Sequence, residues 1–335
     1  MKRLLLIGSL VFGFGASAQE INGGPVNVQG DVIDGVYIKE HIPTKRMIPY
    51  EFVREADVVW SKRVWRVIDM REKINLPIYL PFDYHTPSGQ YVRNTSRWSL
   101  WTILRHHIML GDIKMYSPYN PYQFDMFDGD QFKYPIMPEP GFNYATDSVF
   151  REKAFYYLGR LGADSDTPLS NSEGTDDSVI YDPITGTSTP VYPPRDTIWT
   201  DSKEVVQYKI KEDWFFDKER SVMDVRILGI APVVYKIEEV NGIKEVKGLE
   251  EKYWLYFPHC RYILNNYFVY NDQNDAQWMS FDDFFWKRRF SSTIYKESNV
   301  YEREIDAYRS GVDALLESEK ITEEIRLFEH DVWHF

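Results

Sequence analysis

The sequence predicts an α+β protein in which two related α/β units are joined by an acidic Ser/Thr/Pro-rich linker and followed by a C-terminal amphipathic helix. The first observation behind this fold class is a pattern that occurs twice, in residues 62–81 and 211–232. In both copies a Trp precedes an Asp by three or four residues, a charged cluster follows, and apolar residues then alternate. A repeat spaced by nearly half the chain is typical of a structural unit that is used twice.

The residues that carry this repeat are aromatic and charged, and we interpret them as a structural motif. They are Trp65 and Asp69 in the first copy and Trp214, Phe215, Phe216, Asp217 and Arg220 in the second. The aromatic cluster of the second copy has two interpretations. Buried aromatic side chains fill a core, whereas exposed ones anchor an interface.

The second observation is a helix followed by a strand, which also occurs twice in the same order. Residues 94–110 are predicted to form a helix that ends at Gly111, and residues 112–116 a strand. In the second half, residues 280–289 are predicted to form a helix with acidic residues in its first turn, and residues 292–295 a strand. Two separate parts of the unit therefore recur, which supports an internal duplication.

The third observation is a change in composition across residues 162–203. This stretch is rich in Ser, Thr, Asp, Pro and Gly, and such a composition buries too little apolar area to offset the loss of chain entropy on folding. We therefore expect a linker that is mobile over residues 163–178. It would separate a first unit at residues 51–161 from a second unit at residues 204–300.

Local patterns predict the other elements of the first unit. Apolar residues at helical spacing, with Asp57 as a cap, predict a helix over residues 55–72. Residues 76–82 contain two prolines, which donate no ladder hydrogen bonds, so an edge strand is expected there. A further short helix is predicted over residues 151–161.

The second unit is predicted to be richer in strands. Residues 203–217 fit a helix and a strand almost equally well. Strands are expected over residues 223–235 and 252–257. Asn241-Gly242 supplies the positive φ angles of a tight turn, so residues 233–246 are predicted to form a β-hairpin.

The chain is predicted to end in helices. A short helix is expected over residues 258–265, and residues 301–335 have a helical pattern with two apolar stripes. The stripes are Ile305, Tyr308, Val312, Leu315 and Leu316, and then Ile321, Ile325 and Phe328. Such a terminal helix either covers the core of its own chain or binds a partner.

Charge and aromatic content narrow the classes of partner. The chain has 10 Trp, 24 Tyr and 20 Phe, and its formal net charge is −12. A strongly acidic protein repels nucleic acid and anionic lipid headgroups, so neither is expected as a partner. Abundant aromatic side chains fit a well-filled core together with an adhesive surface.

The N-terminus predicts export. Residues 1–18 have a basic start, an apolar stretch and the sequence Ala16-Ser17-Ala18, so a signal peptide cleaved after Ala18 is expected. The next residue is Gln19 and not Cys, which argues against lipid attachment. We expect residues 19–50 to form an extended N-terminal arm, and association with a membrane only through partners.

No cofactor, metal or catalytic group is predicted. The one cysteine, Cys260, cannot form an internal disulfide and is expected to be buried. The spacing of Asp125, Asp128 and Asp130 resembles a fragment of a calcium-binding loop, although a turn is the preferred interpretation. An Asp/Glu pair of the hydrolase type would require two carboxylates that sequence alone cannot bring together.

Residues 117–150 are the best candidates for partner contacts. The segment has no periodicity, is long for a connecting loop and is rich in Pro, Tyr and Phe, and such loops are usually functional or packed on another element. The candidate contact residues are Tyr119, Tyr122, Phe124, Phe127, Phe132 and Tyr134. Their alternative role is to fill the core of the chain.

Three stretches resemble the GldN/PorN family of gliding-motility and type IX secretion proteins of Bacteroidota. They are KRVWRVIDMREKINLP, DWFFDKERSVMDVRILGIAP and MSFDDFFWKRRFSSTIYKESNVYEREI, and the likeness spans about residues 55–320. The N-terminal arm and residues 163–200 carry no matching motif.

The resemblance implies a non-enzymatic structural subunit located in the periplasm and associated with the outer membrane. Proteins of this family form rings with an outer-membrane lipoprotein, GldK/PorK, and contact the motor protein GldM/PorM. The resemblance offers no catalytic, cofactor-binding or metal-binding residues. Alternative functions are a periplasmic glycan- or peptidoglycan-binding module that uses exposed Tyr and Trp, and an Asp/Glu hydrolase.

Overall fold

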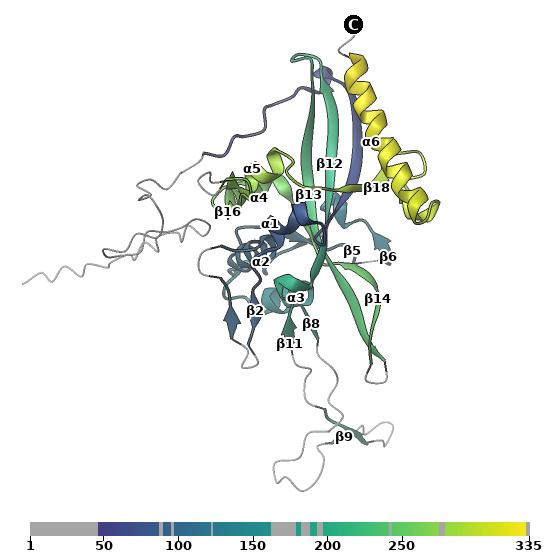
Figure 1. Ribbon diagram of the computed structural model, residues 1–335. Coiled ribbons are helices and arrows are strands. Elements are labelled where there is room, and N and C mark those ends of the chain that lie inside the picture. The colour runs from purple at the N-terminus through teal and green to yellow at the C-terminus, as the bar shows by residue number, and fades with distance from the viewer. Residues whose placement is uncertain are drawn as a thin grey trace, which may run out of the picture.

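The computed structural model describes residues 46–86, 90–94, 97–121, 123–161, 179–181, 188–192, 197–240, 243–274 and 279–332. These residues form a mixed α and β fold with one large antiparallel sheet and six α-helices (Figure 1). The expected signal peptide, most of the N-terminal arm and the segment expected to be mobile lie outside the described residues.

One eight-stranded sheet organises the fold. Its strand order is β18-β1-β12-β13-β15-β4-β7, and β14 also pairs with β13. The strands are β1 (Val58–Asp69), β4 (Met115–Tyr116), β7 (Pro135–Ile136), β12 (Val205–Asp217), β13 (Val222–Val240), β14 (Ile243–Glu251), β15 (Trp254–Tyr256) and β18 (Thr293–Glu297). Strands from the first half (β1, β4 and β7) pair with strands from the second half in this order, so the halves share one sheet.

Strand β1 replaces the helix that was predicted over residues 55–72, and that prediction was wrong. Both edges of β1 are paired, with β12 on one side and β18 on the other. Because both faces of the central sheet are covered, Val64, Trp65 and Arg66 are all buried in succession. This burial on both faces hides the period of two that identifies a half-exposed strand.

The edge strand predicted over residues 76–82 is also wrong, because the chain forms a helical turn there. Helix α1 (Leu76–Tyr79) follows a 3-10 turn, η2 (Lys73–Asn75). Pro77 lies in the first turn, where its missing N–H costs no helical hydrogen bond. The buried side chain of Asn75 donates to the carbonyl oxygens of Asp69 (2.8 Å) and Ser291 (3.0 Å) and holds the turn against the sheet.

Four helices pack with the sheet around the main core. They are α2 (Leu100–Leu110), α3 (Ser148–Leu158), α4 (Phe257–Leu264) and α5 (Phe281–Trp286). The hydroxyl of Ser99 caps α2, and Gly111 ends it with a φ of 88°, as expected for a left-handed C-terminal glycine. In α5, Ser280 and Asp283 form a capping box.

Most second-half predictions are confirmed. Residues 203–217 form a 3-10 turn, η4 (Ser202–Glu204), and then strand β12, so the strand interpretation holds. Val240 pairs with Ile243, which confirms the hairpin of β13 and β14, although Asn241 and Gly242 lie outside the described residues. The predicted elements at residues 252–257, 258–265, 280–289 and 292–295 correspond to β15, α4, α5 and β18.

The C-terminal helix α6 (Val312–Val332) lies against the edge of the sheet that β18 forms (Figure 1). It follows a 3-10 turn, η5 (Ile305–Ala307). The second predicted stripe packs on the sheet, because Ile321 and Ile325 share a buried cluster with Val64 and Ile294. The first stripe is divided, since Ile305 is buried whereas Val312, Leu315 and Leu316 are exposed.

The chain leaves the folded body just before residue 162 and returns to the same place within residues 162–203. Strand β8 (Gly159–Leu161) pairs with β11 (Thr197–Trp199), and β9 (Val179–Tyr181) pairs with β10 (Ser188–Pro190). The two ends of the segment therefore lie side by side. A spacer between two separate units would instead hold its ends apart, so the expected linker is not confirmed.

The expected internal duplication is not confirmed either. After the charged cluster, the first copy of the motif continues into α1, whereas the second continues into β13. Only the later helix-strand pair recurs, as α2 with β4 and α5 with β18.

The remaining elements are short. They are η1 (Glu55–Asp57), β2 (Tyr84–His85), β3 (Tyr91–Val92), β5 (Tyr119–Asn120), β6 (Gln123–Phe127), η3 (Gly129–Gln131), β16 (Phe268–Val269) and β17 (Met279–Ser280). Among the described residues, no helix has the length and apolar character needed to cross a bilayer.

Candidate functional site

The two copies of the sequence motif meet in the centre of the sheet. In the antiparallel ladder of β1 and β12, Trp65 lies opposite Lys211, and Lys62 lies opposite Trp214. Side chains opposite each other in such a ladder point to the same face. The two tryptophans therefore lie on opposite faces of the sheet, and each accompanies a buried charged group.

On one face, a buried carboxylate holds two arginines. Glu212 is 0% exposed, and its carboxylate accepts from both terminal nitrogens of Arg288 at 2.7 and 3.1 Å. Arg66 Nε lies 3.3 Å from the same carboxylate, and desolvation lowers the pKa of Arg66. The ring of Trp214 lies under both guanidinium groups. This arrangement joins β1, β12 and the loop after α5.

On the other face, Lys211 ties the aromatic segment to the sheet. Its Nζ donates to the carbonyl oxygen (2.7 Å) and to Oδ2 (3.2 Å) of Asp130, and Trp65 Nε1 donates to the same Oδ2 at 3.0 Å. Burial lowers the pKa of Lys211. The Nζ atom also lies 5.7 Å from the centre of the Phe132 ring.

Two of the carboxylates whose spacing resembles part of a calcium-binding loop have protein partners. Asp130 binds Lys211 and Trp65, and Asp128 accepts from Lys133 at 3.3 Å. The side chain of Asp125 lies outside the described residues. In the part of the chain that the structure describes, no three His, Cys, Asp or Glu side chains are grouped as metal ligands.

The structure places only some of the candidate contact residues. Tyr119, Phe132 and Tyr134 are half-buried, whereas the side chains of Tyr122, Phe124 and Phe127 are outside the described residues. The Phe132 ring packs edge-on against Tyr116 and Tyr256, and a Cβ at Gly229 would lie 2.8 Å from this ring. Phe132 therefore fills space within its own chain, while partner contact by the other residues stays a prediction.

The other motif residues lie at the end of β12, next to the turn into β13. Asp217 is buried, and its Oδ1 accepts from the backbone N–H groups of Glu219 (2.9 Å) and Arg220 (3.4 Å). Phe215 is buried under the guanidinium of Arg226. Phe216 is half-buried on the sheet.

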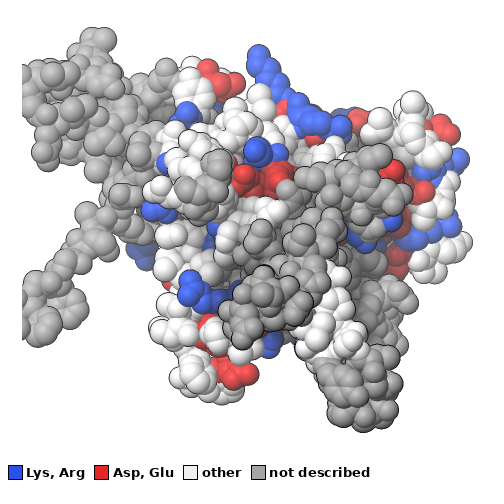
Figure 2. Space-filling model, turned by 90° about the horizontal axis from the view of Figure 1, so that it is seen from below, with Lys and Arg blue, Asp and Glu red and all other residues white. Residues whose placement is uncertain are grey.

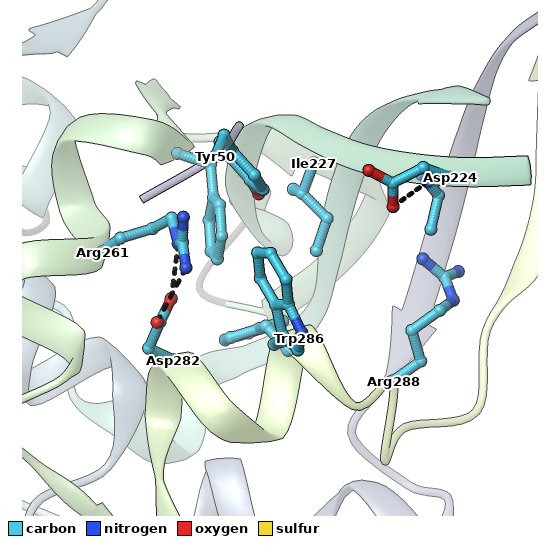
Figure 3. Close-up of a pocket in the computed structure, with 10 residues that line it drawn as sticks. Tyr50, Asp224, Ile227, Arg261, Asp282, Trp286 and Arg288 are labelled. Carbon is cyan, nitrogen blue, oxygen red and sulfur yellow. Dashed lines mark hydrogen bonds and ion pairs between the residues drawn. The ribbon is translucent and has the colours of Figure 1, made fainter. Parts of the chain in front are cut away.

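Sequence reasoning missed a site that anchors the end of the N-terminal arm (Figure 3). The guanidinium of Arg261 lies beside the stacked rings of Tyr50 and Trp286, at 4.3 and 4.8 Å from their centres. Its nitrogens bind Asp282 at 2.7 and 3.0 Å, and Nη2 donates to the carbonyl oxygen of Ile48 at 2.8 Å. The one sequence signal for this site is an arginine on the apolar side of a predicted helix.

This anchor forms one wall of a cavity of about 100 Å³. Pockets for small-molecule ligands usually measure about 300–1,000 Å³. The main charged groups at the cavity are already paired, Arg261 with Asp282 and Arg288 with Glu212. Burial raises the pKa of Tyr50 to about 12, so this ring stays neutral. The geometry fits a structural anchor for the arm.

Larger hollows lie at the surface. One, of about 420 Å³, lies beside α4 and is lined by Met47, Pro49 and Tyr262. Another, of about 590 Å³, lies between α3 and the end of β14, with Phe155 and Tyr156 on its wall. Both are open surface features lined by ordinary polar and aromatic side chains.

Charge on the surface is mixed. Figure 2 shows one face of the molecule, on which Lys and Arg side chains lie near Asp and Glu and much of the described surface is uncharged. A nucleic acid site requires a basic field. The described residues on this face do not form one.

The sole cysteine is expected to be unreactive in the folded protein. Cys260 is 0% exposed, and burial raises its pKa to about 12, so at pH 8 almost no reactive thiolate exists. We expect a thiol reagent to label the native chain very slowly and the unfolded chain once per molecule. A Val300→Cys variant, at a site that is 97% exposed, serves as the reactive control. Rapid labelling of native Cys260 would contradict the observed burial.

The fold and these sites define the class of this protein. It is an α+β protein in which buried, paired charged groups hold the sheet and the arm in place. The family model for the gliding motility associated protein GldN matches residues 53–334. The chain belongs to the GldN family. Curated proteins contain no match to it.

Proposed function

We propose that this chain is a non-enzymatic structural subunit of the type IX secretion and gliding machinery. Its membership in the gliding motility associated GldN family carries this proposal. In the proposed assembly, copies of the chain form a periplasmic ring with a GldK/PorK-like outer-membrane lipoprotein. The ring contacts a GldM/PorM-like motor protein.

The described surface supports a role in assembly. Large apolar side chains are exposed at many places on the described surface, among them the arm, the hairpin of β13 and β14, and the start of α6. Exposed apolar patches with polar surroundings are typical of protein interaction sites. The buried charged groups of the sheet, in contrast, pair with one another and stabilise the fold.

The proposal includes location. A signal peptide cleaved after Ala18 would deliver the chain to the periplasm, and Gln19 at the new N-terminus offers no thiol for lipid attachment. The lipoprotein partner would therefore hold the assembly at the outer membrane. An acidic chain would gain little from contact with anionic lipid itself.

Purification from detergent-solubilised cell envelopes tests this function. A C-terminally tagged chain is expected to elute in a particle many times its own 39.7 kDa mass, together with a lipoprotein. A variant that lacks residues 2–18 is the control, because it should stay in the cytoplasm and elute alone. Recovery of the exported chain only as a free monomer would refute the proposal.

A further inference from the structure

The hairpin of β2 and β3 is joined to the body of the protein by a histidine. Among the described residues these two strands form a small sheet of their own, which projects next to α2 (Figure 1). Nδ1 of His85 on β2 lies 2.7 Å from Oδ1 of Asp201, and Nε2 lies 3.3 Å from Nη2 of Arg105 on α2. One imidazole ring therefore connects the hairpin to α2 and to the chain before η4.

The chemistry of Arg105 determines the protonation state of this ring. A guanidinium group has only N–H donors and keeps its charge, so Nε2 of His85 must accept the hydrogen bond. Nδ1 then carries the proton and donates to the carboxylate of Asp201. In this arrangement the ring of His85 is neutral, with its proton on Nδ1.

Arg105 depends on this acceptor. Its guanidinium lies over the rings of Tyr91 and Trp199, at 4.5 and 4.7 Å from their centres. Nη1 is buried and has no hydrogen-bond partner among the described residues, and desolvation lowers the pKa of Arg105. Because a buried donor without an acceptor is costly, the acceptor that His85 offers to Nη2 stabilises the contact between hairpin and helix.

Two carboxylates, a lysine and a phenol complete the surroundings of the ring. Asp83 is buried and accepts from the hydroxyl of Tyr91 and from a backbone N–H group. Burial, together with Asp83, raises the pKa of Tyr91, so this hydroxyl stays neutral. Nζ of Lys203 lies 3.9 Å from the second oxygen of Asp201. Histidine is the residue type in this group that ordinarily changes its charge between about pH 5 and 8.

We propose that the contacts of His85 with Asp201 and Arg105 form a pH-sensitive latch, which holds the β2–β3 hairpin on α2 at neutral pH and releases it in acid. When the ring takes up a proton, Nε2 becomes a donor and faces the donors of Arg105. The hydrogen bond is then lost and two cations lie side by side. The latch is therefore closed while the ring is neutral and opens as the pH falls through the range in which histidine is protonated. It is a property of the single chain and does not depend on the proposed assembly.

A second histidine of the chain has a similar environment without an arginine. Nδ1 of His107 lies 2.6 Å from Oδ2 of Asp112, and its Nε2 lies 2.8 Å from the hydroxyl of Tyr267. A hydroxyl group can either donate or accept. The neutral and the charged ring of His107 therefore both keep two hydrogen bonds, and no release in acid is expected there.

Nitrogen NMR of the ring tests the closed state. The full chain is prepared with isotope-labelled histidine, and the signals of His85 are identified among the seven histidines by their loss in a His85→Gln variant. At about pH 7.5 we expect a neutral ring with the proton on Nδ1. A charged ring, or a neutral ring with the proton on Nε2, would overturn the inference.

Hydrogen exchange measures the release. The backbone N–H of Asp83 donates to Oγ of Ser202 at 2.9 Å, and that of Ser202 donates to Oδ1 of Asp83 at 2.6 Å, so both amides report whether the start of the hairpin is docked. Their protection factors, corrected for the intrinsic exchange rate, should fall about tenfold between about pH 7.5 and about pH 5.5, the effect of losing one hydrogen bond to a charged group. Constant protection, or a loss shared by all amides of the chain, would contradict a local latch.

Three variants separate His85 from the other titrating groups. His85→Gln offers Arg105 an acceptor that takes up no proton, so the two amides should stay protected at both pH values. His85→Asn can still donate to Asp201 but is too short to reach Arg105, so the amides should be weakly protected at both. His107→Gln is the matched control and should show the same fall as the parent chain.

Each result decides the matter. A fall in His85→Gln equal to that of the parent would assign the acid effect to carboxylates such as Asp83 and overturn the inference. So would strong protection of the two amides in His85→Asn at neutral pH. If His85→Gln does not fold, His85→Asn identifies the NMR signals, and the ring state and exchange of the parent chain provide the decision.

Discussion

Replacing Glu212 with Gln is expected to lower the free energy of unfolding by about 3–5 kcal/mol. The Glu212 carboxylate is fully buried and balances the charges of Arg66 and Arg288. Gln keeps the shape and can accept a hydrogen bond, but it leaves the buried Arg66 and the half-buried Arg288 close together without the carboxylate that balances them. Urea denaturation followed by tryptophan fluorescence measures the loss, since Trp214 lies against this cluster.

The neighbouring residue provides a matched control. Asp213 also binds an arginine through two hydrogen bonds, to Arg63 at 2.6 and 2.7 Å, but this pair is exposed. Exposed ion pairs contribute about 0.2–1 kcal/mol, so Asp213→Asn should cost no more than this. An equal decrease in the free energy of unfolding for the two variants would show that burial does not determine how much Glu212 contributes to stability.

Replacing Asp282 with Asn is expected to destabilise the chain by about 3 kcal/mol and to release the arm. Arg261 is 2% exposed and would lose its counter-ion. The same guanidinium holds the carbonyl oxygen of Ile48 and contacts the ring of Tyr50. Movement of Arg261 toward water would therefore free the segment before β1.

Two measurements separate these effects. Urea denaturation gives the change in stability, and the rate of tryptic cleavage after Arg54 reports release of the arm. The control is Glu323→Gln, which removes a surface partner of Arg326 on α6 and should change neither measurement. A destabilised Asp282→Asn chain whose arm is cleaved no faster than in the parent would contradict the anchoring role.

Local signals predicted much of the second half of the chain. The Asn-Gly pair indicates the β13–β14 hairpin, and the alternating apolar residues of β13 have the period of a strand. The capping box at Ser280 and Asp283 marks the start of α5. Each signal acts over a few residues, so no information about distant segments is needed.

The first half was harder to predict because its contacts are distant in sequence. β1 gains its hydrogen bonds from β12 and β18, which follow it by well over a hundred residues. Its buried Arg66 resembles a surface residue until Glu212 and Arg288 are placed beside it. The prolines of residues 76–82 are equally compatible with an edge strand and a helical first turn.

In the candidate site, too, local sequence signals identified some residues and missed others. Trp65, Trp214 and Asp217 were recognised as a structural motif from their concentration in the sequence. Lys211 and Glu212 were not singled out, because charged residues in a strand usually face water. The anchor of Arg261 was missed because Tyr50 lies in a segment without periodicity and is brought to α4 only by folding.

By itself, the sequence determined the mixed α and β character, the elements with local signals and the resemblance to the GldN family, which the match over residues 53–334 confirms. The tertiary structure alone decided that both halves share one sheet, which charges are buried as pairs, and which apolar side chains remain exposed. The physical reason is that burial and ion pairing depend on neighbours in space, and in this chain those neighbours come from opposite halves of the sequence.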